Sequence, residues 1–267
     1  MAGKKKDTSL LHHLVGSRSL VWNLAKNDIK KKFAGSYFGV VWAFVQPVIT
    51  VLLYWFVFEK GLNSKATDLR TGIEIPFVLW LTAGLVPWFY FQEALNGGTG
   101  VLVEYSYLVK KVVFQIDMLP VVKMISALFT HLFFVAFTMV LFICMGYMPD
   151  WYALQVIYYS FCMILFATGL VYATSAVTVF FRDMKEVVGI LLQNFETMVQ
   201  IPGWAITVLK LNPMYYIVSG YRNALINHIG FWEDMGLTVY FWVVTAVILF
   251  LGTTVFKRLR PHFADVL

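Results

Sequence analysis

Four polar side chains late in the chain have the types and spacing that could do chemistry: Gln193, Glu196, Thr197 and Gln200. Positions i, i+3, i+4 and i+7 of a helix share one face, so the four would form a polar stripe. In surroundings as apolar as these, such a stripe avoids lipid and meets water, a polar substrate or another helix. Two interpretations stay open, a polar path through the molecule or a polar contact between helices.

The sequence shows no other set of residues arranged for catalysis or metal binding. No H-E-x-x-H or G-x-S-x-G motif occurs, and the histidines lack metal-ligand spacing. The chain also lacks G-x-x-x-x-G-K-[ST], so it does not bind ATP through a P-loop of its own. Glu93 and His131 are isolated polar residues for which we expect hydrogen-bonded packing. We therefore predict a protein that is not an enzyme and holds no metal.

Composition places the chain in a membrane. Hydrophobic residues make up 60% of it and charged residues 13%, about half the charged fraction of an ordinary soluble domain. The net charge of +6 comes mostly from the chain ends, which indicates lipid headgroup contact and membrane orientation, with no nucleic-acid partner. Cys144 and Cys162 lie in apolar runs and are expected to pack as free thiols.

The apolar runs predict an all-α integral membrane protein whose transmembrane domain covers 37–260. A helix needs about 20 residues to cross hydrocarbon. The six predicted spans lie at about 37–58, 76–96, 120–148, 151–181, 184–201 and 236–256. The fifth is interrupted by Pro202-Gly203, so residues 204–234 are predicted to form external re-entrant helices buried in protein.

Two polar regions belong to the cytosolic side in this topology. Residues 1–36 form a basic tail and an amphipathic interfacial helix with Trp22, Ala25, Ile29 and Phe33 on its apolar face. Between the second and third spans, Gly100–Lys123 forms an island of charged and aromatic residues, with a short helix at about 101–111.

The charges support this orientation. All but five of the 21 lysines and arginines fall in the tail, in the island, in the Arg182 cluster or just before the C-terminal segment 261–267. Positive charge collects on the cytosolic side of membrane proteins, so both termini are predicted to be cytosolic. The five on the outer side are Lys60, Lys65, Arg70, Lys210 and Arg222.

Four ordered stretches carry a family resemblance. They are DIKKKFAGSYFGVVWAFVQP (28–47), VPWFYFQEALNGGTGVLVEYSYLVKKVVF (86–114), FFRDMKEV (180–187) and LNPMYYIVSGYRNAL (211–225). Together they resemble the permease subunit of ABC-2-type exporters, in the branch that exports wall teichoic acid, O-antigen polysaccharide and capsule. The resemblance runs from about Trp22 to Arg260. One departure is Phe114-Gln115, where the family usually has Phe-Pro.

The resemblance implies a homodimer in the bacterial cytoplasmic membrane, with two copies of a separate ABC ATPase that bind ATP and Mg. The island becomes the coupling helix that docks on the ATPase. Its contact residues would be Tyr105, Leu108, Lys110 and Lys111, flanked by Arg182 and Asp183.

The resemblance also implies a route for a lipid-linked polymer between two permeases. Lys30, Lys31 and Lys32 would meet the diphosphate of the lipid carrier, and Lys210 and Arg222 would form an outer gate. Phe38 and Trp42 would line the path together with the polar stripe.

The predicted function is export of an undecaprenyl-diphosphate-linked polymer. The similarity of the stretches YWFVF and LNPMYYIVSGYRNAL to the family favours wall teichoic acid as the cargo, with O-antigen or capsular polysaccharide as the alternative. A membrane-embedded enzyme acting on lipid-linked sugars would explain the aromatic residues and the basic helix. It should also show an acidic catalytic cluster, which is missing. A passive channel would explain the polar stripe but has no use for a coupling island.

Overall fold

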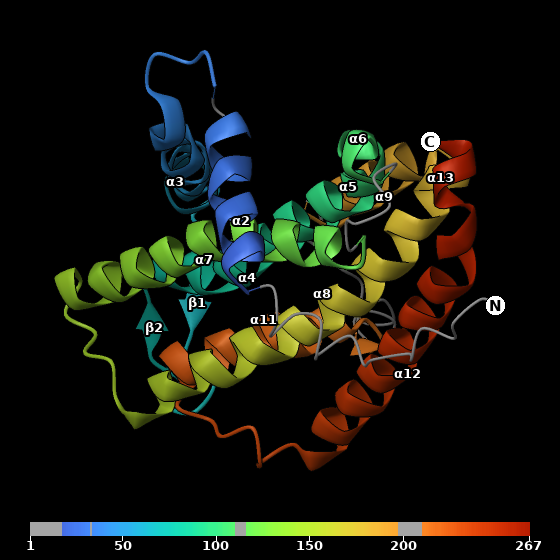
Figure 1. Cartoon of the computed structure of the whole chain (residues 1–267). Coiled ribbons are helices and arrows are strands. Elements are labelled where there is room, and N and C mark those ends of the chain that lie inside the picture. The colour runs from blue at the N-terminus through green and yellow to red at the C-terminus, as the bar shows by residue number, and fades with distance from the viewer. Residues whose placement is uncertain (1–17, 33, 110–115, 197–209) are drawn as a thin grey trace.

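Helices form nearly all of this computed structural model, which describes residues 18–32, 34–109, 116–196 and 210–267 (Figure 1). The long helices are α3 (Trp42–Trp55), α4 (Phe77–Thr99), α7 (Met118–Cys144), α8 (Gln155–Phe180) and α12 (Met235–Leu259). Shorter helices are α2 (Arg18–Lys32), α5 (Val101–Glu104), α6 (Ser106–Val109), α9 (Met184–Glu196), α11 (Pro213–Arg222) and α13 (Phe263–Val266). Helical turns η1 (Gly39–Val41), η2 (Phe56–Gly61), η3 (Trp151–Leu154), η4 (Asn223–Asn227) and η5 (Arg260–His262) join or extend them.

Four helical stretches in the described part of the chain are long and apolar enough to cross a membrane. They are Gly39–Gly61, Met118–Cys144, Trp151–Phe180 and Met235–Val266. Each overlaps a predicted span and differs from it mostly by a few residues at the ends. The predicted all-α membrane class is therefore confirmed, and the count of six spans stays a prediction.

The two other predicted spans correspond to α4 and α9. With 23 residues, α4 is about 34 Å long at the standard rise, which is enough to cross. Most of its side chains are buried, so they contact other helices of the protein and not lipid. The described part of α9 has 13 residues, and the end of the predicted fifth span lies outside the described residues.

The α8 helix is the centre of the packing, with α12, α4 and α11 against it. The closest approach is between α8 and α12, where Gly169 faces Gly252. A Cβ built on Gly252 would collide with the carbonyl oxygen of Gly169, and one on Gly169 would lie 2.8 Å from the amide nitrogen of Leu249. Only glycine allows two backbones to pass this closely.

The helix α2 packs across α7 and uses only part of its predicted apolar face for this contact. Val21, Ala25 and Asp28 are buried, whereas Trp22 is exposed and Ile29 is half-buried. Phe33, the last member of the predicted apolar face, lies outside the described residues. The reason is local shape, because the small Ala25 lets the α2 backbone approach Met118 and Val122 on α7, and Ser126 Oγ donates to Ala25 O at 3.1 Å.

One end of the molecule carries a small hairpin, which lies between the first and second predicted spans. Strand β1 (Ala66–Thr67) pairs antiparallel with β2 (Glu74–Ile75). The Asn227 side chain accepts from Leu69 N at 3.0 Å, and Arg70 donates to His228 O. The hairpin is thereby joined to the segment that follows α11.

The predicted re-entrant region contains α11 and η4, which pack against α4 and α8. Residues 204–209 of that region lie outside the described residues. Much of α11 and η4 is buried, whereas Leu211 and Trp232 at the two ends of the described part are exposed; a re-entrant arrangement in the membrane stays a prediction.

The predicted coupling helix is split into the short helices α5 and α6, with Tyr105 between them. The helix α5 packs against α7 and α8, and one apolar cluster joins residues of both short helices to α8, α12 and α13, among them Leu102, Ala176 and Phe263. Figure 1 shows α5 and α6 beside the C-terminus and the β1–β2 hairpin at the other end of α4. The coupling segment and the hairpin are therefore a helix length apart.

Candidate functional site: a charged cavity

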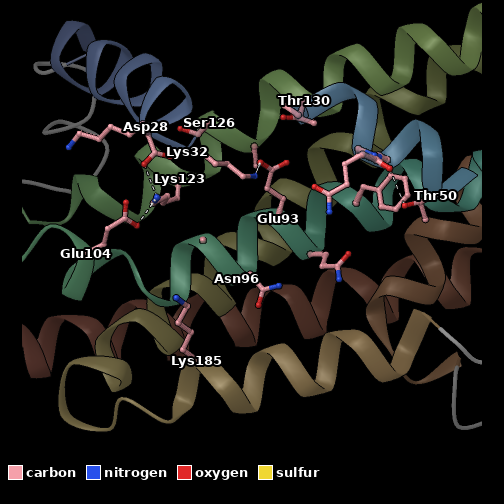
Figure 2. A pocket seen from close by; sticks show the side chains of 18 residues that line it. Asp28, Lys32, Thr50, Glu93, Asn96, Glu104, Lys123, Ser126, Thr130 and Lys185 are labelled. Carbon is pink, nitrogen blue, oxygen red and sulfur yellow. Dashed lines mark hydrogen bonds and ion pairs between the residues drawn. The ribbon is translucent and has the colours of Figure 1, made fainter. Parts of the chain in front are cut away.

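A cavity of about 750 Å³ opens between α2, α3, α4 and α7, near the end of the molecule that carries α5 and α6 (Figure 2). Its lining combines apolar residues with lysines and carboxylates from separate helices. The polar and charged lining residues are Asp28, Lys31, Lys32, Gln46, Thr50, Gln92, Glu93, Asn96, Glu104, Lys123, Ser126, Thr130 and Lys185. Ionisable residues at membrane depth are costly and mark candidate functional sites, so this cavity is the candidate site.

Polar residues reach the cavity because of local spacing on α3 and α4. Gln92, Glu93 and Asn96 lie within one turn and a half of α4 and share a side of the helix. On α3, Pro47 cannot donate a backbone hydrogen bond to the carbonyl of Ala43, which also lines the cavity. Both helices therefore present hydrogen-bonding groups to the same space.

An ion-pair network closes one side of the cavity. Lys123 Nζ lies 2.7 Å from Asp28 Oδ1 and 2.8 Å from Glu104 Oε2, and the Tyr105 hydroxyl donates to Asp28 Oδ1 at 2.8 Å. Figure 2 shows Asp28, Lys123 and Glu104 converging from three elements. Burial, together with the hydrogen bond to Asp28, raises the pKa of Tyr105. Its hydroxyl therefore stays protonated and acts as a donor at neutral pH.

A second ion pair crosses the cavity mouth from α2 to α4. Lys32 Nζ lies 2.7 Å from Glu93 Oε1, and both side chains are partly accessible to solvent, so screening weakens the pair. The neighbouring Lys31 places its ammonium 5.2 Å from the centroid of the Tyr105 ring. Two lysines of α2 thus face the cavity and its charged wall.

A smaller cavity of about 380 Å³ shares Asn96, Gly97, Glu104 and Lys185 with the first. It extends the space toward Arg182, at the turn between α8 and α9. Lys185 lies along Gly100, where a Cβ would be 3.6 Å from its Cδ. The combined cavity therefore carries more cationic than anionic groups at this end.

The predicted ATPase contacts fall into two groups. Tyr105 is only 2% exposed and points to Asp28, so its side chain is turned away from the surface on which the prediction placed it. Leu108 is half-buried, and Arg182 and Asp183 are exposed. Lys110 and Lys111 lie outside the described residues.

The predicted residues of the polymer path are not brought together in the described part of the chain. Phe38 and Trp42 are exposed beside each other at the start of α3, with ring centroids 5.9 Å apart, and neither lines the cavity. Gln193 and Glu196 lie on α9. Thr197 and Gln200 lie outside the described residues.

The residues predicted to bind the diphosphate and to form the outer gate also fall into different places in the structure. Lys31 and Lys32 line the cavity, whereas Lys30 is exposed and is absent from the lining. Lys210 is exposed. Arg222 lies over the Trp80 ring, 3.4 Å from its centroid, and its Nη2 would be 2.6 Å from a Cβ on Gly84. The Arg222 guanidinium is thus used in the contact of α11 with α4.

Sequence reasoning did not identify Asp28, Glu104 and Lys123 as members of one site. Lys123 lies beside an apolar stretch, which was a signal, whereas Asp28 lies among lysines and gives none. The buried His131, by contrast, was expected to be hydrogen-bonded. Its Nε2 lies 3.2 Å from Ser160 Oγ and 3.1 Å from the Tyr221 hydroxyl.

The fold and the cavity together define a multi-pass, almost wholly helical membrane protein with a charged internal site. The chain belongs to the ABC-2 type transporter family, whose sequence pattern it matches over residues 19–226. It is therefore a transport subunit, and family membership implies an ABC ATPase as its partner.

Curated relatives cover nearly the whole chain. An O-antigen export system permease protein RfbA from Myxococcus xanthus is 25% identical over 265 residues, which is 96% of this chain and 98% of that protein. A protein of the same name from Klebsiella pneumoniae is 22% identical over 255 residues, covering 91% and 93% of the two chains.

Proposed function

We propose that this chain is the permease subunit of an ATP-driven exporter that moves an undecaprenyl-diphosphate-linked polysaccharide across the bacterial cytoplasmic membrane. The observation that carries the proposal is the similarity to O-antigen export permeases along 96% of the chain. The two sequence stretches favour wall teichoic acid, but the relatives named above support the polysaccharide alternative. We therefore place O-antigen-type polysaccharide first among the cargoes.

The working unit in this proposal is a homodimer with two ATPase subunits and with both termini in the cytosol. The ATPase docks on the coupling segment 101–111 and on Arg182 and Asp183. Leu108, Lys110 and Lys111 supply the contacts on the segment. Tyr105 is reassigned to an inward role because its side chain is buried against Asp28.

The cavity is the place where the lipid carrier's diphosphate first meets the protein. Lys31 and Lys32 lie at its edge on α2, and Lys32 is held by Glu93. A diphosphate carries more negative charge than one carboxylate and can compete for the Lys32 ammonium. Arrival of the headgroup would release Glu93 and loosen the contact between α2 and α4. Lys30 would attract the headgroup from the membrane surface.

The polymer then passes between the two permeases. Phe38 and Trp42, exposed at the start of α3, and the stripe Gln193, Glu196, Thr197 and Gln200 are the proposed lining. The outer gate is α11 with Lys210 at its approach. Arg222 holds α11 to α4 through Trp80, so its gate role is to fix that helix.

Reconstitution tests the proposal directly. The chain and its ATPase are placed in vesicles, and ATP-driven transport is compared for a diphosphate-linked neutral polysaccharide, a lipid-linked teichoic acid and the carrier lipid alone. The proposal expects transport of the polysaccharide that requires ATP. Transport of teichoic acid alone would restore the first cargo assignment, and transport without ATP would overturn the exporter function.

A further inference from the structure

We propose that the hydrogen bond from Tyr105 to Asp28 is a mechanical link through which the coupling segment moves α2 and thereby opens and closes the charged cavity. This inference rests on the proposed function, because it assumes that an ATPase acts on the coupling segment. It assigns positioning roles to Tyr105, Asp28 and Lys123, three residues that make contact with one another inside the protein.

The link joins elements that are distant in the sequence. The Tyr105 hydroxyl donates to Asp28 Oδ1 at 2.8 Å across 77 residues, and Lys123 Nζ donates to the same oxygen at 2.7 Å across 95 residues. A single carboxylate oxygen of α2 is therefore held by the coupling segment and by α7 at once.

Burial makes this contact strong. Asp28 is 5% exposed and Tyr105 2%, so water cannot readily replace either partner. Hydrogen bonds to charged groups are among the stronger ones in proteins, and leaving a buried carboxylate without its donors is costly. By comparison, the pair of Lys32 with Glu93 has side chains that are 53% and 26% exposed, so this ion pair is weaker than the buried contact of Tyr105 with Asp28.

The difference in strength decides which contact of α2 breaks when the coupling segment moves. When the coupling segment shifts, the buried contact at Asp28 holds and carries α2 with it. The exposed contact between Lys32 and Glu93 breaks first, and it lies at the cavity mouth. Cation–π contacts also stabilise the position of Tyr105, because the ammonium groups of Lys31 and Lys123 lie 5.2 and 5.6 Å from the centroid of its ring.

The substitution Tyr105→Phe tests the link by removing one hydroxyl and keeping the ring. A matched control is Tyr172→Phe, which removes a buried hydroxyl that donates to the Asp117 carbonyl at 2.8 Å and has no contact with α2. Each variant loses one buried hydrogen bond, and the loss of stability should be larger in Tyr105→Phe because its acceptor is charged. Only Tyr105→Phe breaks the connection between the coupling segment and α2.

The readout is the accessibility of the cavity, which does not depend on the cargo. Asn96→Cys places a thiol in the lining, in a chain whose two native cysteines are replaced by alanine. Its rate of reaction with a small charged methanethiosulfonate is measured in the complete complex with and without a non-hydrolysable ATP analogue. We expect the analogue to change the rate about tenfold in this background and in Tyr172→Phe. We expect a change of less than about twofold in Tyr105→Phe, although the ATPase stays bound.

Two results would overturn the link. One is a Tyr105→Phe variant in which the analogue still changes the labelling rate about tenfold. The other is an Asn96→Cys background in which the analogue does not change the labelling rate at all. Failure of the proposed cargo would look different, because nucleotide would still change accessibility while the polysaccharide would not be transported. As a second measurement, polysaccharide exported per ATP hydrolysed should fall about tenfold in Tyr105→Phe and stay unchanged in Tyr172→Phe.

Discussion

Asp68 organises the turn of the β1–β2 hairpin. Its Oδ1 accepts from Arg70 N at 2.8 Å, and its Oδ2 accepts from the Thr71 hydroxyl at 2.7 Å. Burial opposes ionisation of this carboxyl, but the hydrogen bonds from the Thr71 side chain and from two backbone amides outweigh it and lower the pKa of Asp68. Because the folded-state pKa is lowered, the carboxylate contributes stability above the ordinary value of about 3.9 and loses it as the pH falls.

The substitution Asp68→Asn should lower the free energy of unfolding by about 1 kcal/mol at pH 7, seen as a drop of about 2–4 °C in melting temperature in detergent. The gap between wild type and variant should shrink as the pH falls below about 4, because the carboxyl of Asp68 is then protonated in the unfolded chain and must lose that proton on folding. Asp265→Asn, at an exposed carboxylate, is the control and should melt like the wild type at both pH 7 and pH 3. A gap of equal size at pH 3 and pH 7 would contradict the assignment.

Single residues show where sequence reasoning about the site stops. Lys31, Lys32 and Glu93 could each be noticed from the sequence, because a charge beside an apolar run needs a reason. The partners could not, since Asp28 and Lys123 are 95 residues apart and no local pattern relates them. The inward orientation of Tyr105 was likewise hidden, because it depends on the break between α5 and α6.

Among the helices, the crossing of α8 and α12 depends on two glycines without side chains. The substitution Gly252→Ala would place a Cβ against the carbonyl oxygen of Gly169, so the helices must separate or shift. We expect a loss of about 1–3 kcal/mol in the free energy of unfolding, the usual range for an overpacked interior. The measurement is thermal unfolding in detergent.

The control for this crossing is Gly189→Ala on α9, where a Cβ would meet no heavy atom within 4 Å. It should be neutral or slightly stabilising, because alanine favours the helix more than glycine does. Equal melting temperatures for Gly252→Ala and the wild type would show that the backbones are not in contact at this point.

Elements were predicted well where hydropathy decides them and poorly where packing does. The spans of α3, α7, α8 and α12 follow from apolar runs, so their positions were close. The side of α2 that meets α7 could not be predicted, because Ala25, a small residue, decides it. The hairpin was missed because two strands of two residues each are too short to show alternation.

For the whole molecule, orientation in the membrane is the property on which the mechanism depends. Cysteines are placed at Leu69, exposed in the hairpin, and at Tyr107, exposed on the coupling segment, in a chain without native cysteines. An impermeant maleimide added to intact cells or spheroplasts should label Leu69→Cys and not Tyr107→Cys. Permeabilised cells should show labelling at both. Labelling of Tyr107→Cys from outside would place the segment where no cytosolic ATPase can reach it.

The last prediction concerns the cavity mouth and uses the pair Lys32→Cys and Glu93→Cys. The two original side chains meet at 2.7 Å, but they are long, so a direct disulfide would need closer backbones. A short, reducible bis-methanethiosulfonate can bridge the two thiols and tie α2 to α4. If the headgroup must separate these helices to enter, the bridge should reduce polysaccharide export to the background level while the ATPase stays bound.

Each preparation serves as its own reference for this experiment. Export is measured before the reagent, after it, and after the bridge is reduced, and the two single-cysteine variants are treated in the same way. Recovery on reduction, in the double variant alone, would show that separation of α2 from α4 is a step of transport. A bridged protein that exports at its untreated rate would place the route for the headgroup elsewhere, because the mouth would then have stayed closed throughout the cycle.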